Sequence, residues 1–463
     1  MDHTLPDDVD GLARRLRAAL DGGPAVSPLP RLRADAPPAG TALVVRTSGS
    51  TGAPREVALT AAALRASATA THDRLGGPGR WVLTLPATHI AGLQVLVRAA
   101  LAADEGVPDP LVAAEPGAHF TPDGLAALLR PALADGVGVH ISLVPTQLHR
   151  VLAAADDGAG AGLDALSRCA SVLVGGAATA PALFARSRAA GVPVVRTYGM
   201  SETAGGCVYD GVPLAGVRLR LTAPTGSGAA HNLGRPVGAG GALGNVGADA
   251  VSPVSPVGVV GVVEIAGPTL ALGYLGDPDA TAEAFRADAC GPEAGTRWFR
   301  TSDLGSLAAT ATPDRAARDE SARGGDGSPA GDPTEAVVLS VLGRADDVVV
   351  TGGVNVAPAT VEAALADLAP AALGLPAVEP CVVGVPDDEW GQALVAVVAA
   401  PGRDERLVAV DADALARVRA AVAARLGAPS APRRVYVTGA LPLRGPGKVD
   451  RRAVARAAEA AGH

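Results

Sequence analysis

A run of hydroxyl-bearing and glycine residues near the N-terminus has the chemistry to bind phosphate. Residues 45–57 read VRTSGSTGAPREV and follow a β-branched stretch that predicts a strand. Backbone N–H groups and Ser or Thr hydroxyls can hold phosphate oxygens, and glycine lets the main chain approach them closely. This points to a nucleotide, although a short Ser/Gly run is also typical of an ordinary turn. A Walker loop is excluded, because Gly52 is followed by Ala-Pro-Arg-Glu and not by Lys and Ser or Thr.

The second chemical signal is a single lysine. Lys448 lies in LPLRGPGKVDRR, residues 441–452, and all the others among the 39 Lys and Arg residues are arginines. An ammonium is a compact charge on a flexible stem, whereas a guanidinium is a wide planar fork. A position that keeps lysine in such a chain indicates a role that arginine cannot fill. A surface lysine left by chance is the alternative.

Secondary structure must position these residues, and residues 40–200 alternate between strand and helix patterns. Alanine-rich stretches predict helices at 60–75 and 180–191, with Gly191 ending the second. Thr121 and Pro122 are typical of an N-cap and a first helical residue. β-Branched runs predict strands at 41–47, 81–86, 138–146, 171–176 and 192–199. This alternation indicates an α/β fold.

A second α/β pattern begins after Gly343. It predicts helices at 359–368, 411–427 and 450–462, and strands at 381–386, 393–400 and 433–439. Residues 222–258 and 307–335 are rich in Gly, Ala, Pro, Ser and Asp without apolar periodicity, which predicts loops. We therefore expect two domains, residues 1–342 and 343–463.

Composition narrows the function classes. The net charge of the 463 residues is −8, and the arginines are scattered among carboxylates, which argues against nucleic acid as a partner. The four cysteines are far apart, which argues against a disulfide framework or a zinc site. The N-terminus is acidic where a signal peptide would be basic, and no apolar run reaches the ~20 residues of a membrane span. We predict a soluble cytoplasmic protein without a membrane span.

Eight segments in a fixed order carry a more specific signal. They are TSGSTGAPRE (47–56), LPATHIAGLQ (85–94), VGGA (174–177), TYGMSET (197–203), GVVEIAGPTLALGY (261–274), WFRTSDLG (298–305), GRADDVVVTGGVNVAPATVE (343–362) and LPLRGPGKVDRR (441–452). Together they resemble the adenylate-forming superfamily of acyl- and aryl-CoA synthetases, luciferases and peptide-synthetase adenylation domains. The resemblance implies a large N-terminal α/β domain, shortened at its N-terminus, and a small mobile C-terminal α+β lid domain.

The resemblance also implies a reaction in two steps. A carboxylate has no leaving group, so it attacks the α-phosphate of ATP to give acyl-AMP and pyrophosphate, and a thiol then expels AMP. Catalysis of the first step is largely positioning and stabilisation of charge. ATP, Mg²⁺ and coenzyme A are the implied cofactors and co-substrates. We expect the lid domain to rotate between the two steps about a hinge near Asp346.

Residue by residue, the resemblance implies the following contacts. Glu202 would bind Mg²⁺, a hard cation that prefers oxygen ligands, with Thr203 beside the α-phosphate. Lys448 would contact the substrate carboxylate and the α-phosphate during adenylation. The β- and γ-phosphates would be held by the loop that comprises Thr47, Ser48, Gly49, Ser50, Thr51, Gly52 and Arg55, where the family usually has lysine in place of Arg55.

The remaining implied contacts involve the nucleoside and the thiol. Tyr198, followed by Gly199, would stack on adenine opposite the turn Gly175, Gly176 and Ala177. Asp303 would accept both ribose hydroxyls, and Arg344 would donate to the ribose. Gly352 and Gly353 would line the pantetheine tunnel.

Within the superfamily the chain is most similar to the o-succinylbenzoate-CoA ligases of menaquinone biosynthesis. The stretches that carry this similarity are residues 46–68, 85–98, 141–150 and 196–211. Gly205 and Gly206 would leave backbone on which an aryl ring can lie flat. His89 and Gln147 would contact the keto or distal carboxylate group, and Arg196 would balance the second carboxylate. Each residue also has a purely structural interpretation. His89 would be a histidine in the wall of the pocket, Gln147 a residue at a helix start, and Arg196 a surface residue of a strand.

Three alternatives remain. Another aryl- or acyl-CoA ligase, or a stand-alone adenylation domain that loads a carrier protein, would share every nucleotide motif. A catalytically silent scaffold should have lost Glu202, Asp303 or Lys448, and all three are present. The oligomeric state is open, with a homodimer as one alternative.

Overall fold

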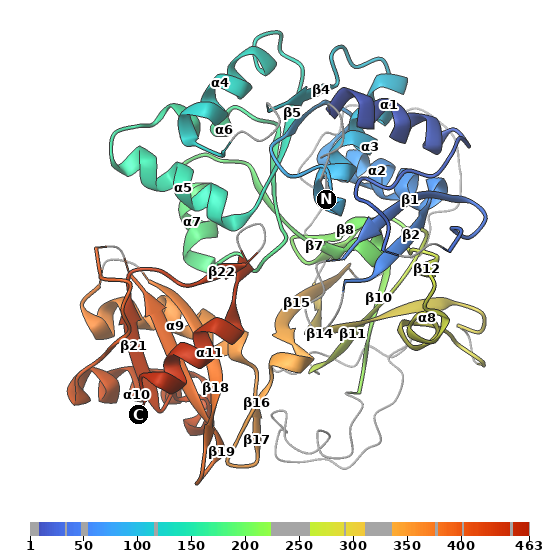
Figure 1. The fold of residues 1–463 in the computed structure, drawn as a ribbon. Helices are drawn as coiled ribbons and strands as arrows, with labels where there is room; N and C mark the ends of the chain where they lie inside the picture. The colour runs from blue at the N-terminus through green and yellow to red at the C-terminus, as the bar shows by residue number, and fades with distance from the viewer. Residues whose placement is uncertain are drawn as a thin grey trace, which may run out of the picture.

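The computed structural model of the chain has a larger N-terminal lobe and a smaller C-terminal lobe (Figure 1). The larger lobe ends with β15 (Ala336–Arg344), and the smaller one follows the short helix η3 (Ala345–Asp347). The structure describes residues 9–32, 35–47, 54–114, 119–223, 260–290, 293–310, 336–375, 378–400, 402–444 and 448–462.

A seven-stranded sheet forms the centre of the larger lobe. Its order is β4-β3-β5-β6-β7-β8-β9, and β4 to β7 are parallel. The last two strands run antiparallel, because β7 turns through η1 (Ser201–Thr203) directly into β8. The strands are β3 (Arg80–Leu83), β4 (Leu111–Ala113), β5 (Val139–Leu143), β6 (Ser171–Val174), β7 (Val194–Met200), β8 (Gly205–Tyr209) and β9 (Val212–Pro213).

Helices cover both faces of this sheet. Trp81 and Leu83 of β3 pack among helices α1 to α3, whereas Val82 between them packs among α4 to α6 on the other face, as the alternation of side chains along a strand requires. The helices are α1 (Val9–Leu20), α2 (Ala61–Leu75), α3 (Ile90–Asp104), α4 (Pro122–Ala132), α5 (Pro145–Asp156), α6 (Ala161–Ser167) and α7 (Pro181–Ala189).

Side chains at the helix ends account for several of these bounds. The Thr60 hydroxyl accepts from the Ala63 N–H at the start of α2, and Thr121 caps α4 with Pro122 in its first turn. Gly191, just after α7, has a φ of +79°, a left-handed conformation that favours glycine. The predicted helices at 60–75 and 180–191 are confirmed. The strand predicted at 138–146 ends at Leu143, because Pro145 begins α5.

Two smaller sheets complete the larger lobe. The first is β1 (Thr41–Arg46), β2 (Glu56–Thr60) and β12 (Gly273–Tyr274), and α8 (Pro278–Ala284) follows it. The second contains β10 (Arg218–Thr222), β11 (Val260–Ala266), β13 (Phe285–Ala287), β14 (Arg297–Thr310) and β15.

The expected loops at 222–258 and 307–335 lie mostly outside the described residues. The loop prediction is wrong at 307–310, because β14 continues to Thr310 and pairs with β15. Its register places Leu307 opposite Leu339 and Ala308 opposite Val338. Cross-strand pairing thus forms a strand where local composition favoured a loop.

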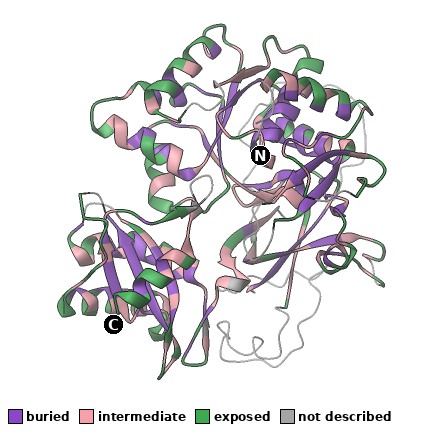
Figure 2. Cartoon of the chain, viewed as in Figure 1, coloured by how far each residue is buried: buried purple, intermediate pink, exposed green. Residues whose placement is uncertain are grey.

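The smaller lobe packs helices against a six-stranded sheet. Figure 2 shows its strands as largely buried and the outer faces of its helices as exposed. The strands are β16 (Val349–Thr351), β17 (Val354–Val356), β18 (Glu379–Asp387), β19 (Gly391–Ala399), β20 (Val408–Ala409) and β21 (Arg434–Thr438). The helices are α9 (Pro358–Leu373), α10 (Ala412–Leu426) and α11 (Arg451–Ala460), and a hairpin, β22 (Leu443–Arg444) with β23 (Lys448–Val449), precedes α11. The helices and strands predicted after Gly343 are confirmed.

The division into domains at 342/343 stays a prediction. In the structure this position lies inside β15, which continues to Arg344 and pairs there with Asp303 of β14. The register therefore attaches Arg344 to the larger lobe.

Candidate active site

The candidate site lies at the carboxyl ends of β6 and β7. Gly175 and Gly176 follow β6, while β7 carries Tyr198 and leads into Glu202 and Thr203 of η1. Ligands of open parallel sheets bind at this edge. The chain order of β6, β7 and η1 thus brings three separate motifs to one place.

Glu202 lies beside a tyrosine from a distant segment, and an arginine packs on that tyrosine. The Tyr274 hydroxyl donates to its Oε1 at 2.9 Å, and the Arg55 guanidinium lies 4.9 Å above the Tyr274 ring. Burial raises the pKa of Glu202 above its usual value, while the Tyr274 hydrogen bond and Arg55 lower it in part. An acidic group held out of water gains most from a cation placed beside it.

Tyr198 and Asp303 meet across the site. The Tyr198 hydroxyl donates to Asp303 Oδ2 at 2.7 Å, so the predicted adenine and ribose contacts touch each other. Burial first, and then the Asp303 charge, raise the pKa of Tyr198 well above its usual value. The phenol therefore keeps its proton and remains a donor at neutral pH. Arg344 lies opposite Asp303 in the β14–β15 register.

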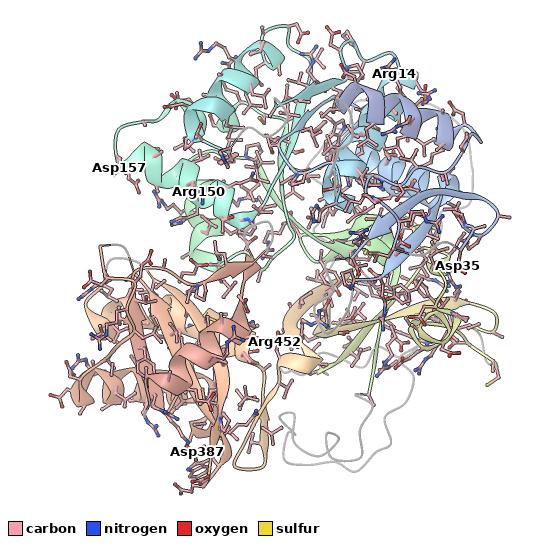
Figure 3. The ribbon with its side chains drawn as sticks, in the orientation of Figure 1. Arg14, Asp35, Arg150, Asp157, Asp387 and Arg452 are labelled. Carbon is pink, nitrogen blue, oxygen red and sulfur yellow. The ribbon has the colours of Figure 1, made fainter. Side chains whose placement is uncertain are left out.

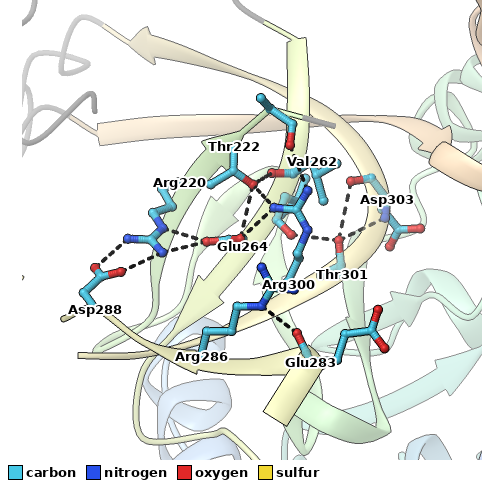
Figure 4. Close-up of polar contacts among 12 residues, drawn as sticks. Arg220, Thr222, Val262, Glu264, Glu283, Arg286, Asp288, Arg300, Thr301 and Asp303 are labelled. Atoms are coloured by element: carbon cyan, nitrogen blue, oxygen red, sulfur yellow. Dashed lines mark hydrogen bonds and ion pairs between the residues drawn. The ribbon is translucent and has the colours of Figure 1, made fainter. Parts of the chain in front are cut away.

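Asp303 is held by the sheet from which it projects. Its N–H donates to the Thr301 hydroxyl at 3.0 Å, and that hydroxyl donates to the Val263 carbonyl at 2.8 Å (Figure 4). Nearby, Glu264 lies between Arg220 and Arg300, with N–O distances of 2.8 and 2.9 Å. The buried Glu264 carboxylate is thus paired with two partly exposed arginines, and these ion pairs join strands β10, β11 and β14.

The glycines of the site are required by what packs against them. A Cβ on Gly175 would lie 2.2 Å from Thr197 Oγ1, and one on Gly199 would lie 2.1 Å from the Gly205 carbonyl oxygen. Gly205 has a φ of +95°, and a Cβ there would lie 3.1 Å from Gln94 Cγ. A Cβ on Gly206 would lie 2.9 Å from the Tyr209 ring. The neighbouring protein atoms therefore explain these glycines without a bound aryl ring or base.

Four predicted residues have their polar groups engaged within the protein. Thr203 is buried and its hydroxyl donates to the Gly205 carbonyl at 2.8 Å. The Gln147 Oε1 accepts from the Val144 N–H at 3.0 Å at the start of α5, as a helix-start residue would. Arg196 pairs with Asp210 at 3.3 Å and is about half exposed. His89 precedes α3, with Nδ1 3.1 Å from the hydroxyl of the preceding threonine.

The structure describes the two ends of the predicted phosphate loop. Thr47 and Arg55 exchange hydrogen bonds of 2.8 and 3.2 Å at the base of the phosphate loop. The loop residues Ser48, Gly49, Ser50, Thr51 and Gly52 lie outside the described residues. The side chains of Asp346 in η3 and Lys448 in β23 also lie outside them. The roles of all these residues stay predictions.

The predicted pantetheine glycines form the turn between β16 and β17. Gly352 has a φ of +56°, and a Cβ there would lie 2.6 Å from the Trp390 ring. Gly353 has a φ of +76° and open space beside it. The turn therefore requires left-handed backbone at both positions.

Sequence reasoning did not single out Tyr274 or the buried Arg98, which donates to Tyr209 near Gly206. Arg98 of α3 is 4% exposed, lies 4.9 Å over the Trp81 ring and donates to the Tyr209 hydroxyl at 3.2 Å. No carboxylate in the described part of the chain pairs with it, and its Nε has no hydrogen-bond partner there. Tyr274 and Tyr209 are two of only four tyrosines, and this rarity was the available signal.

The side chains at the site suit a cation whose ligands are mostly phosphate oxygens and water molecules. Among the described residues there is no group of three or more His, Cys, Asp or Glu side chains that could hold a metal ion. Mg²⁺ is usually held by one or two carboxylates together with phosphate oxygens and water. The half-buried Glu202 carboxylate fits that role, since desolvation raises its pKa and a cation would stabilise its charge.

Comparison with known proteins identifies the class. The AMP-binding enzyme family matches residues 8–275, and the AMP-binding enzyme C-terminal domain matches residues 370–448. The chain belongs to this family of adenylate-forming enzymes, and among them it is an AMP-forming acid–CoA ligase that uses ATP.

Relatives and solved structures agree with this assignment. A probable 2-succinylbenzoate–CoA ligase of Mycobacterium tuberculosis is 40% identical over 421 residues, which cover 90% of this chain and 84% of the relative. The fold matches that of ATP-bound MatB from Rhodopseudomonas palustris, with a TM-score of 0.62, 23% identity and coverage of 90% and 68%. It also matches o-succinylbenzoate CoA synthetase from Bacillus subtilis with its acyl-adenylate intermediate, with a TM-score of 0.60, 23% identity and coverage of 89% and 69%. Within the described ranges, no helix is long and apolar enough to cross a membrane.

Proposed function

We propose that this ligase activates o-succinylbenzoate as its acyl-adenylate and transfers it to coenzyme A, giving o-succinylbenzoyl-CoA for menaquinone biosynthesis. The name of the 40% identical relative supports this acid. The same name is carried by a 29% identical protein of Geobacillus kaustophilus, matched over 90% of this chain.

The structural observation that supports the proposal is the buried charge of Arg98, which no described carboxylate balances. A buried cation without a counter-charge costs several kcal/mol in a protein, and an anionic group of a bound ligand would offset that cost. Gln94, one turn before Arg98 on α3, contacts Gly205, and the Tyr209 hydroxyl bonded to Arg98 would lie 3.6 Å from a Cβ on Gly206. We assign the second carboxylate of the substrate to Arg98 on the ground of this unbalanced charge. Arg98 replaces Arg196 in our proposal, since Asp210 already pairs with Arg196.

In the proposed first step the chain's residues bind and orient the reactants. Asp303, with Arg344 beside it, binds the ribose, and Tyr198 keeps the Asp303 carboxylate in place while its ring covers the adenine. Glu202 would hold Mg²⁺, and the bound cation would neutralise phosphate charge. Lys448 stabilises the charge that develops between the carboxylate and the α-phosphate. The lid domain then rotates near Asp346, and Gly352 and Gly353 admit the pantetheine thiol.

A comparison of acid substrates tests the proposal. We would measure AMP release with o-succinylbenzoate, benzoate and a medium-chain fatty acid, each with and without CoA. We expect turnover of o-succinylbenzoate that depends on CoA, and little turnover of the monocarboxylates. Strong turnover of benzoate with none of o-succinylbenzoate would refute the proposed substrate. AMP release that CoA does not stimulate, but a carrier protein does, would favour a stand-alone adenylation domain.

A further inference from the structure

Arg451 lies where the lysine hairpin, the hinge segment and the core of the smaller lobe meet. It is the first residue of α11, three residues after Lys448. Its Nη2 donates to Glu362 Oε2 at 2.7 Å, and its Nη1 donates to the Val382 carbonyl at 2.9 Å. Its Nε lies 3.6 Å from Asp347 Oδ2 in η3. One guanidinium thus joins α9, β18 and the segment that links the lobes.

The contacts of Arg451 with α9 and β18 form a closed ring. Glu362 accepts from Arg451 with Oε2 and from the Val382 N–H with Oε1 at 2.7 Å, while the Val382 carbonyl accepts from Arg451. The Glu362 side chain is 17% exposed, so solvent weakens this pair less than a surface pair. Burial alone would lower the pKa of Arg451, but the Glu362 carboxylate raises it above its usual value. The planar fork of arginine fits this ring, whereas a lysine ammonium does not.

The chain between Arg451 and Lys448 is also fixed. Lys448 pairs with Arg444, and Val449 pairs with Leu443. The Asp450 N–H donates to the Pro442 carbonyl at 2.8 Å, and the Asp450 side chain caps α11 at the Ala453 N–H. No residue from 448 to 451 is therefore free to move independently of the next. The position of the Lys448 backbone follows from the anchoring of Arg451.

We infer that Arg451 is a positioning residue for adenylation, because it holds the base of the hairpin that carries Lys448 at a fixed place relative to the hinge segment. The inference rests on the proposed role of Lys448 and goes beyond it, since Arg451 touches no reactant. Asp347 is the contact that extends this anchoring to the hinge.

The two half-reactions separate positioning from general stability. Lys448 acts in adenylation, so a displaced hairpin should slow that step alone, whereas a partly unfolded lobe should slow both. We would measure ATP–pyrophosphate exchange with o-succinylbenzoate, and separately the transfer to CoA from supplied o-succinylbenzoyl-AMP. We expect Arg451→Lys to lower exchange about tenfold or more, as for the loss of a charge-assisted hydrogen bond, and to leave the transfer rate within about twofold.

A matched control lies next to Arg451 on the same helix. Arg452 is exposed (Figure 3), no described residue pairs with it, and Arg452→Lys should leave both half-reactions unchanged. Equal losses in both half-reactions of Arg451→Lys, a loss in transfer alone, or no loss of exchange would each overturn the inference. If the wild-type protein exchanges with benzoate but not with o-succinylbenzoate, the proposed substrate fails, and the Arg451 comparison proceeds with benzoate.

Discussion

Replacing Arg98 by methionine should have two effects of opposite sign. The side chain is 4% exposed, and no described carboxylate balances its charge. Methionine fills a similar volume but carries no charge, so its burial has no desolvation cost. The Tyr209 hydroxyl keeps Thr71 as a partner at 3.0 Å, so the change leaves no buried hydroxyl unpaired.

The structure sets the expected size of each effect. Replacing buried charged groups by apolar residues of similar volume is neutral or stabilising by about 1–4 kcal/mol, and each kcal/mol corresponds to about 2–4 °C in Tm for a domain of ~150–250 residues. The bound acid, in contrast, loses a hydrogen bond to a charged group, which is worth about 1.5–3 kcal/mol. We therefore expect an unchanged or higher Tm for the free protein and a kcat/KM for o-succinylbenzoate that is about 10- to 150-fold lower.

Thermal unfolding without ligand and steady-state AMP release measure the two effects of Arg98→Met. Benzoate is the control substrate: its kcat/KM should be low in the wild type and unchanged in the variant, because benzoate has no second carboxylate. Arg196→Met is the control variant, because Asp210 already pairs with that arginine on the surface. A lower Tm together with equal losses for both acids would show that Arg98 supports the fold and does not bind the substrate.

Three further predictions follow from the site and its core. Lys448→Arg keeps the charge but should abolish ATP–pyrophosphate exchange, and ordinary exchange in that variant would contradict the proposed role of the lysine. Tyr198→Phe removes the 2.7 Å hydrogen bond to Asp303, so the KM for ATP should rise about tenfold, with the KM for CoA as the unaffected reference. Burial lowers the pKa of His140 to about 4 from an ordinary 6.5, so the unfolded state binds the proton more readily and stability should fall as the pH drops from about 6.5 towards 4. By pH 5 this histidine alone should account for about 2 kcal/mol of lost unfolding free energy, and urea titrations at pH 7 and pH 5 should give a smaller loss for His140→Gln than for the wild type.

Local patterns were sufficient to predict several helices and their ends. The cap at Thr60, the N-cap and proline at Thr121–Pro122 and the end of α7 at Gly191 all depend on neighbouring residues. The error at 307–310 arose because those residues become a strand through pairing with β15, 26 or more residues away in the chain. Pairing between distant segments has no local signature.

The candidate site was predictable as a set of motifs but not as a set of contacts. The sequence indicated Glu202, Asp303 and Tyr198, but not that Tyr198 donates to Asp303. It did not single out Tyr274, because this residue reaches Glu202 only through the tertiary fold. Gly205 and Gly206 suggested space for a ring, whereas the structure has Gln94 and Tyr209 packed against them. A glycine in a sequence indicates that there is no room for a side chain. It does not indicate whether protein atoms or a bound ligand occupy that space.

The β14–β15 register has a consequence for the proposed rotation of the lid domain. Asp303 and Arg344 are cross-strand partners, and Arg344 is the last residue of β15 before η3. A ribose bound to both Asp303 and Arg344 would hold the two strands together at the point where the chain leaves the larger lobe. Binding or release of the nucleotide would then directly change the stiffness of the proposed hinge near Asp346. No conformational change in the core of the larger lobe would be needed.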